Sequence, residues 1–271
     1  MIRPLRAAAI GAALLVLLAG CASSPAANGP DRDPSASSTP SDAGPELTGD
    51  LTVFAAASLS GAFDKLSEEF EKQHPSVDVK PVSYDGSSVL ATQINEGASV
   101  DVFASADERN MAKVTEAGNA ADPTVFATNT LQIAVAPGNP KKITGLESLS
   151  AAGLTVVLCA PEVPCGNASQ TLLKDAGVVL KPASEEQNVT AVLSKVKNGE
   201  ADAGLVYRTD VTAAGDAVTG VDIANTSKAV NRYPVVALKD APNKAVAEAF
   251  VAFVLSPEGR TVLDSFGFGA P

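Results

Sequence analysis

Short apolar stretches alternate with amphipathic stretches along most of this chain, and this alternation constrains the fold more than any other feature. In the first pair, an apolar run over 51–57 is followed by apolar side chains at helical spacing up to Phe70, and Pro75 ends the pattern. Further strands are expected near 77–84, 100–104, 131–136, 154–159, 203–207, 221–224 and 235–238, with helices near 59–73, 89–97, 107–118, 167–176, 188–199, 244–255 and 257–266. Such alternation predicts an α/β fold with mostly parallel sheets.

The N-terminal region has the composition of a targeting segment followed by a linker rather than of a folded domain. Arg3 and Arg6 precede an apolar run over 7–18, and small residues then lead to Cys21. This order resembles a bacterial lipobox, so we expect 1–20 to be a lipoprotein signal peptide, with cleavage before Cys21 and a lipid on its sulfur. An ordinary secretion signal and a start-transfer helix are the alternatives. Residues 21–48 are rich in Ser, Pro, Ala, Gly and Asp, which favours a flexible linker.

The charge balance narrows the classes of partner. The chain carries 31 acidic and 20 basic residues, a net charge of −11. It has no basic run after its N-terminus, so nucleic-acid binding is not expected. Any anion site must therefore depend on local hydrogen-bond donors rather than on overall attraction. Beyond the N-terminal region, about 220 residues remain, which are enough for one large core or for two lobes.

Two cysteines lie close together in the middle of the chain. Cys159 and Cys165 are separated by five residues, two of which are prolines. A close pair outside the cytoplasm usually oxidises, so a disulfide is expected. A pair of metal-binding thiols is the alternative. With a single histidine in the chain, His74, this second interpretation has little support.

Small polar residues recur where an expected strand leads into an expected helix. Ser58 follows the first strand, and further turns contain Ser87, Cys165 and Asn188. We expect Ser58 to be the N-cap of the first helix, and Asp107 and Asn188 to cap two later helices. A helix N-terminus presents unpaired N–H groups and a partial positive charge, which suit an anion. Taken alone, each turn is better explained as ordinary capping.

In combination, these turns resemble a known family. The segments concerned are VFAAASL at 53–59, GSSVLATQI at 86–94 followed by DVFASAD at 101–107, NV at 188–189 ahead of GLVY at 204–207, and YPVV at 233–236. In this order they are similar to the molybdate-binding components of bacterial ABC importers. The similarity extends from about residue 51 to about residue 268.

The resemblance implies a two-lobed periplasmic-binding-protein fold of type II, with helices around each sheet and two crossover strands as the hinge. One lobe would comprise 50–128 with 233–271, and the other 129–232. It also implies a ligand set in the cleft between the lobes. The ligands would be the hydroxyl and N–H groups of Ser58 and Ser87, the N–H groups of Cys165 and Val189, and the hydroxyl of Tyr207. The Cys159–Cys165 disulfide would then fix the loop that aims the Cys165 N–H.

The chemistry of this donor set suits molybdate, a tetrahedral dianion whose oxygens only accept hydrogen bonds. Tungstate is expected to bind as well. Sulfate and phosphate are the alternatives, and phosphate would gain from a carboxylate acceptor because it keeps a proton part of the time. Asp85 is the candidate for such an acceptor, and we expect it to point to solvent or to cap its turn. No direct cation ligand is expected.

Catalysis is not expected. A serine nucleophile would need a base, and the single histidine, His74, is expected to be a solvated residue at the end of a helix, just before Pro75. Neither a Ser-x-x-Lys arrangement at Ser58 or Ser87 nor a Gly-x-Ser-x-Gly elbow occurs. An iron-binding relative would need a tyrosine cluster, and of the three tyrosines only Tyr207 falls at a site position. A structural surface lipoprotein is the remaining alternative. The resemblance implies a monomeric, lipid-anchored receptor on the outer face of the cell membrane, without a cofactor, that docks on an ABC permease driven by a separate ATPase.

Overall fold

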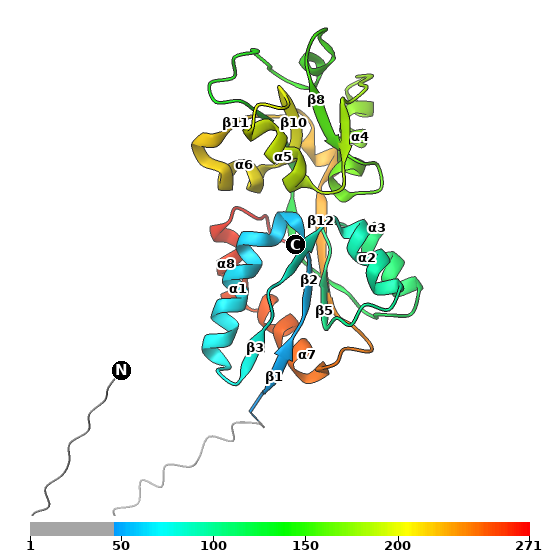
Figure 1. Ribbon diagram of the computed structural model, residues 1–271, viewed down its shortest axis with the longest axis vertical. Coiled ribbons are helices and arrows are strands. Elements are labelled where there is room, and N and C mark those ends of the chain that lie inside the picture. The colour runs from blue at the N-terminus through cyan, green and yellow to red at the C-terminus, as the bar shows by residue number, and fades with distance from the viewer. Residues whose placement is uncertain (1–45) are drawn as a thin grey trace, which may run out of the picture. The chain divides into compact units, whose positions relative to one another are not determined.

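A computed structural model describes residues 46–271 of the chain. In this part the backbone forms two five-stranded sheets and a two-stranded parallel pair of β1 (Gly49–Leu51) with β3 (Val77–Val79). Helices flank both sheets (Figure 1). The α/β fold class predicted from the sequence is confirmed.

The first sheet has the strand order β4-β2-β5-β12-β6. Its strands are β2 (Val53–Ala56), β4 (Ser83–Asp85), β5 (Val102–Ala104), β6 (Thr124–Asn129) and β12 (Asn231–Ala237). One face packs against α1 (Ser60–Gln73), α7 (Lys244–Val254) and α8 (Pro257–Ser265). The other packs against α2 (Ser87–Asn95) and α3 (Glu108–Glu116). The largest side chains of the first core are aromatic, and the rings of Phe70 and Phe250 meet edge to face at 5.2 Å.

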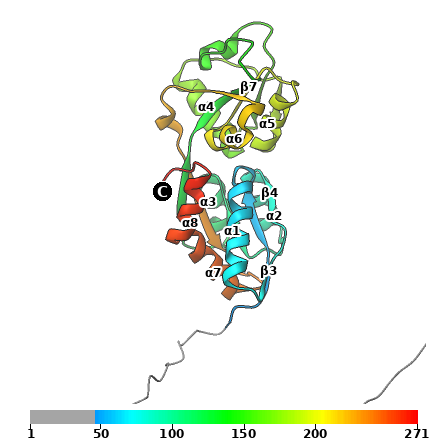
Figure 2. The same ribbon diagram turned by 90° about the vertical axis from the view of Figure 1, so that its left-hand side faces the viewer.

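The second sheet has the order β11-β7-β10-β8-β9. Its strands are β7 (Leu131–Val135), β8 (Val156–Cys159), β9 (Ser184–Glu186), β10 (Ala203–Tyr207) and β11 (Thr219–Val221). A single apolar core joins these strands to α4 (Pro164–Asp175), α5 (Val189–Lys197) and α6 (Arg208–Ala214). The two sheets therefore have separate cores within residues 46–271, and the turned view in Figure 2 shows one above the other.

The chain passes between the two sheets twice. It leaves the first sheet at the end of β6, enters the second at β7, and returns through β12 (Figure 1). β12 runs antiparallel to both of its neighbours, β5 and β6, and β7 runs antiparallel to β10 and β11. Both sheets are consequently mixed, with two parallel and two antiparallel pairings each, rather than mostly parallel as expected. The cause is the double crossing, since the connecting strands do not follow the strand–helix–strand pattern.

Local differences from the sequence prediction have identifiable causes. The strand expected at 77–84 is two strands, β3 and β4, separated at Pro81, which has no N–H to donate to a ladder. β6, β9 and α6 were not predicted. β9 and α6 are short, and β6 begins directly after Pro123 in a stretch without clear periodicity. The two C-terminal helices are confirmed.

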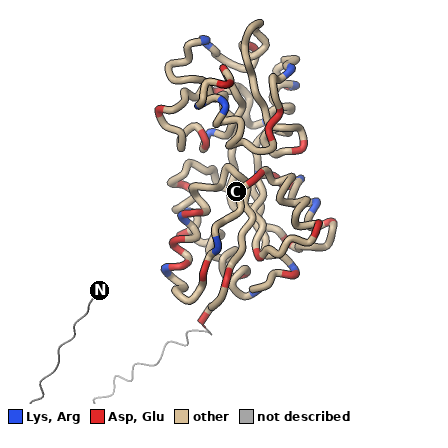
Figure 3. Tube along the Cα trace, viewed as in Figure 1, with Lys and Arg blue, Asp and Glu red and all other residues tan. Residues whose placement is uncertain are grey.

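The signal peptide expected at 1–20, the lipidated Cys21 and most of the linker expected at 21–48 lie outside the described residues. Within 46–271, every helix falls short of the length and apolar character that crossing a membrane requires. Lys, Arg, Asp and Glu are scattered over this region rather than gathered by sign (Figure 3).

Candidate functional site

All five residues predicted to bind the ligand line one small cavity between the two sheets. The cavity leaves about 10 Å³ for the centre of a water-sized sphere. It is far smaller than the roughly 300–1,000 Å³ of sites that take drug-sized organic molecules. Its walls come from both halves of the described fold and are formed by Ala56, Ala57, Ser58, Asp85, Gly86, Ser87, Ala106, Val163, Pro164, Cys165, Asn188, Val189 and Tyr207. A small ion fits such a cavity better than an organic solute.

Ser58 lies in a short 3₁₀ turn (Ala57–Leu59) between β2 and α1. The expectation that it is the N-cap of the first helix is wrong, because α1 begins at Ser60 and its N-cap is Leu59, without a side-chain capping bond. The extra turn lets the Ser58 side chain reach the cavity instead of folding back onto the helix. Its Oγ lies 3.0 Å from the hydroxyl oxygen of Tyr233.

Ser87 is the first residue of α2 and is completely buried. The N–H of Ala106 donates to its Oγ at 2.9 Å, which leaves the hydroxyl proton of Ser87 free to be donated. The backbone N–H of Ser87 belongs to the first turn of a helix and has no intrahelical acceptor. Ser87 thus offers two donors from one position.

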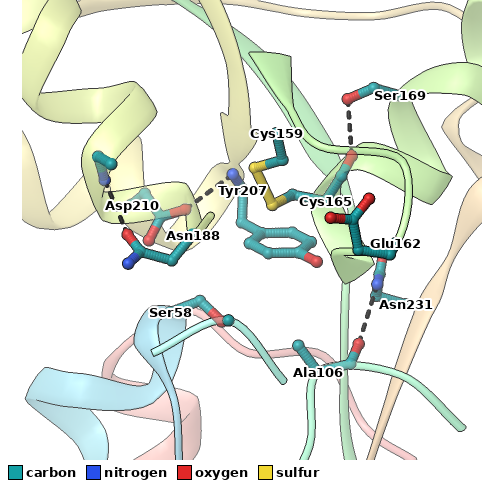
Figure 4. Close-up of a disulfide and its surroundings, with 12 residues drawn as sticks. Ser58, Ala106, Cys159, Glu162, Cys165, Ser169, Asn188, Tyr207, Asp210 and Asn231 are labelled. Carbon is teal, nitrogen blue, oxygen red and sulfur yellow. Dashed lines mark hydrogen bonds between the residues drawn. A yellow bond between two sulfur atoms is a disulfide. The ribbon is translucent and has the colours of Figure 1, made fainter. Parts of the chain in front are cut away.

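Cys165 lies in the first turn of α4, which begins at Pro164, three residues earlier than predicted. Proline at the first helical position loses no hydrogen bond, because that N–H would be unpaired in any case. Cys165 forms a disulfide with Cys159, at a Cα–Cα distance of 5.7 Å (Figure 4). The next residue must be small, since a Cβ on Gly166 would lie 1.9 Å from the carbonyl oxygen of Ala160. The disulfide and this close approach hold the helix start, and with it the Cys165 N–H, against β8.

Val189 is the first residue of α5, and its N–H lies at that helix start. The predicted N-cap, Asn188, is confirmed: its Oδ1 accepts the N–H of Ala191 at 2.9 Å. This bond takes up one of the four orphan N–H groups of the helix and leaves the Val189 N–H without an intrahelical acceptor.

Tyr207 ends β10, and its ring is buried beside the disulfide (Figure 4). Its hydroxyl oxygen is buried and has no hydrogen-bond partner among the described residues. Burial is the main factor that raises the pKa of this phenol well above its ordinary value, and the nearby Tyr233, Asp107 and Asp210 raise it further. The hydroxyl therefore stays protonated and can donate. An unpaired buried hydroxyl is costly, so this group is suited to donate to an acceptor bound in the cavity.

The backbone beneath Tyr207 is held by Asp210, whose Oδ2 accepts the Tyr207 N–H at 2.8 Å. Burial raises the pKa of Asp210 to about 7, and the bond from the Tyr207 N–H opposes that shift.

The sequence comparisons agree with this geometry. The family model described as bacterial extracellular solute-binding protein matches residues 51–269. The chain belongs to this family. The molybdate-binding protein ModA of Mycobacterium tuberculosis (strain ATCC 25618 / H37Rv) is 47% identical over 222 residues, which is 82% of this chain and 85% of that protein.

Two solved structures share the fold of this solute-binding protein. The Azotobacter vinelandii periplasmic molybdate-binding protein has a TM-score of 0.73 and 24% identity, over 82% of this chain and 99% of that one. The substrate-binding domain of a putative molybdenum ABC transporter from Clostridium difficile has a TM-score of 0.61 and 27% identity, over the same shares.

In its described lining, the cavity of the solute-binding protein offers hydrogen-bond donors but no cationic side chains. Among the described residues that line it, none is Lys or Arg. Its donors are hydroxyl groups and the N–H groups of helix starts, which carry a partial positive charge. No group of three His, Cys, Asp or Glu side chains that could hold a metal ion occurs in residues 46–271.

The sequence interpretation missed two features of the site. Tyr233 was not assigned to the site, yet it contacts both Ser58 and the ring of Tyr207, whose centroid is 6.0 Å away. Asp85 was expected to point to solvent or to cap its turn. Its Oδ1 does accept the neighbouring Gly86 N–H at 2.7 Å, but the residue is half-buried and also lines the cavity. Both positions depend on contacts across the two sheets that no local pattern encodes.

Proposed function

We propose that this extracellular solute-binding protein captures molybdate, and also tungstate, in the cavity between its two sheets. The observation that carries the proposal is the convergence of Ser58, Ser87, Cys165, Val189 and Tyr207 on one small cavity. All five offer donors, and a fully deprotonated tetrahedral dianion offers only acceptors. The relatives named above support the choice of molybdate over other tetrahedral anions.

The donor count is consistent with tight binding. Hydrogen bonds to a charged group contribute about 1.5–3 kcal/mol each. The unpaired hydroxyl of Tyr207 would gain an acceptor, and the helix starts would gain a counter-charge. In this proposal the protein is not catalytic and needs no cofactor, because binding and release are its whole task.

The proposed transport role requires that the cleft open and close. We propose the lobes expected from the sequence, 50–128 with 233–271 and 129–232, as the moving bodies. The hinge is formed where β6 leads into β7 and where β12 returns. The closed, loaded protein would dock as a monomer on an ABC permease driven by a separate ATPase. A lipid on Cys21 would keep it at the outer face of the cell membrane.

Isothermal titration calorimetry of the protein with molybdate, tungstate, sulfate and phosphate tests this function. We expect molybdate and tungstate to bind with similar affinity, and sulfate and phosphate to bind at least about 100-fold more weakly. Binding of sulfate or phosphate alone would overturn the assignment.

Tyr207→Phe is expected to separate binding from folding. The variant removes a buried hydroxyl that has no partner in the described structure, so the free energy of unfolding without ligand stays the same or rises by about 1 kcal/mol. The same change removes a donor to the anion and should weaken molybdate binding about tenfold. Chemical denaturation and calorimetric titration measure the two effects.

Tyr84→Phe is the matched control for this prediction. The Tyr84 hydroxyl donates to Asp64 Oδ1 at 2.7 Å and lies 3.1 Å from the Ser60 carbonyl oxygen, and Tyr84 does not line the cavity. We expect this variant to lose stability and to keep its affinity. If Tyr207→Phe lost stability and kept its affinity, Tyr207 would be removed from the ligand set.

A further inference from the structure

The two halves of the fold are joined at the edge of the cavity by a hydrogen bond between side chains. The Nδ2 of Asn188, at the start of α5, donates to the Oδ1 of Asp85, at the end of β4, at 2.8 Å. The two residues are 103 positions apart in the chain and belong to different halves of the fold. Both are half-buried and both line the cavity.

Each partner is held in place by a second hydrogen bond. Asp85 Oδ1 also accepts the Gly86 N–H at 2.7 Å, which fixes the carboxylate in its turn. Asn188 Oδ1 accepts the Ala191 N–H at 2.9 Å, which orients the amide so that its Nδ2 faces Asp85. Since both groups are preorganised, little side-chain entropy is lost when the halves meet.

The same two turns hold anion donors of the proposed site. Ser87 follows Asp85 by two residues, and Val189 follows Asn188 directly. A bond between Asp85 and Asn188 therefore fixes the spacing between a donor from the first half and a donor from the second.

Other side-chain hydrogen bonds also cross between the same halves. Asn129 Nδ2 donates to Thr209 Oγ1 at 2.8 Å where β6 leads into the second half, away from the cavity. Two more lie closer to the cavity, and both are weaker candidates for this task. Arg109 Nη1 donates to Asn167 Oδ1 at 3.1 Å on the exposed surface. Asn110 Nδ2 donates to the Glu162 carbonyl at 3.3 Å, while also serving both oxygens of Asp107. The Asp85–Asn188 bond is shorter, has an ionised acceptor and touches the cavity itself.

We propose that Asp85 and Asn188 form a latch that holds the closed cleft around the anion, so that they are positioning residues that slow ligand release. The inference rests on the function proposed above and assigns to Asp85 a role other than solvation or proton acceptance. Asp85 Oδ1 accepts two N–H groups at the edge of a cavity whose described lining contains no Lys or Arg.

Asn188→Asp is the variant that breaks the latch with the least change elsewhere. Aspartate caps a helix as well as asparagine does, so the bond to the Ala191 N–H should persist. The donor to Asp85 is replaced by a second carboxylate, and like charges at that distance repel. We expect the molybdate Kd, measured by calorimetry, to rise about thirtyfold, with the thermal midpoint of the ligand-free protein unchanged.

The double variant Asp85→Asn/Asn188→Asp is the rescue. It exchanges donor and acceptor and keeps one carboxylate in the pair. The amide introduced at position 85 can accept the Gly86 N–H through its oxygen, while its nitrogen donates to the carboxylate introduced at position 188. We expect a Kd within about threefold of wild type.

The outcomes separate the latch from the function on which it rests. The latch is overturned if Asn188→Asp binds molybdate with wild-type affinity, or if the double variant binds as weakly as Asn188→Asp alone. In either case, binding of molybdate by the wild-type protein would still uphold the function. Should wild type bind sulfate instead, the proposed function fails and the same variant series with sulfate still decides the latch. A wild type that binds none of the four anions overturns both.

Discussion

Gly86→Ala is expected to weaken molybdate binding by at least about 100-fold while the protein still folds. Gly86 has φ −60° and ψ 135°, a conformation open to any residue, so alanine causes no backbone strain. A Cβ at this position would lie 2.1 Å from the carbonyl oxygen of Gln187 and 3.3 Å from Cγ1 of Val163, both in the other half of the cleft. A backbone oxygen cannot move aside as a side chain can, so the methyl group should keep the cleft from closing.

Calorimetric titration and small-angle X-ray scattering of the variant with excess molybdate test this prediction. We expect little heat of binding and a radius of gyration that does not fall when molybdate is added. Gly145→Ala is the matched control. Gly145 is also extended, and a Cβ there would approach only the flexible carboxylate of Glu147, outside the cavity. Unaltered affinity in Gly86→Ala would show that binding does not need the closed arrangement.

Ser87→Ala should weaken molybdate binding about 100-fold. The change removes a completely buried hydroxyl whose proton is free to donate into the cavity. It also leaves the buried Ala106 N–H without its acceptor, which should cost about 1–3 kcal/mol of folding free energy. The position of Ala106 in the cavity wall should change as well, because the bond from its N–H to Ser87 Oγ holds it there.

Ser88→Ala is the control for Ser87→Ala. Ser88 is the next residue of α2, is also buried, and has a hydroxyl without a partner in the described structure. It does not line the cavity. We expect wild-type affinity and unchanged or slightly higher stability, measured by calorimetry and chemical denaturation. Equal affinities of the two variants would remove the Ser87 hydroxyl from the site.

Sequence patterns were sufficient to predict elements with a regular pattern of burial. The spacing of Phe63, Leu66 and Phe70 predicted α1, because a single buried face imposes the helical period. The continuous apolar run at 203–207 predicted β10, which is buried at every position. Capping chemistry was equally readable: Asp107 and Asn188 accept N–H groups at their helix starts as expected. Helix spacing, apolar runs and capping residues each depend on a few neighbouring residues, so the sequence alone reveals them.

The residues at which the helices begin were harder to predict from the sequence. Ser58 has the side chain of an N-cap but lies in a 3₁₀ turn, and Cys165 was placed in a loop but lies inside a helix. In both cases the deciding interactions come from distant residues. The Ser58 hydroxyl meets Tyr233, 175 positions away, and the disulfide holds the start of α4 against β8.

By itself, the sequence determined the α/β alternation, the helix caps and a set of donor residues whose order pointed to one site, since each is written in a few neighbouring residues. The tertiary structure decided the mixed strand directions, the small size of the cavity and the contacts across it. Asp85, Gly86 and Tyr233 acquire their roles only when β12 and the β6–β7 connection bring the two sheets together. Contact across a cleft depends on the relative position of two folded halves, and no stretch of neighbouring residues encodes that position.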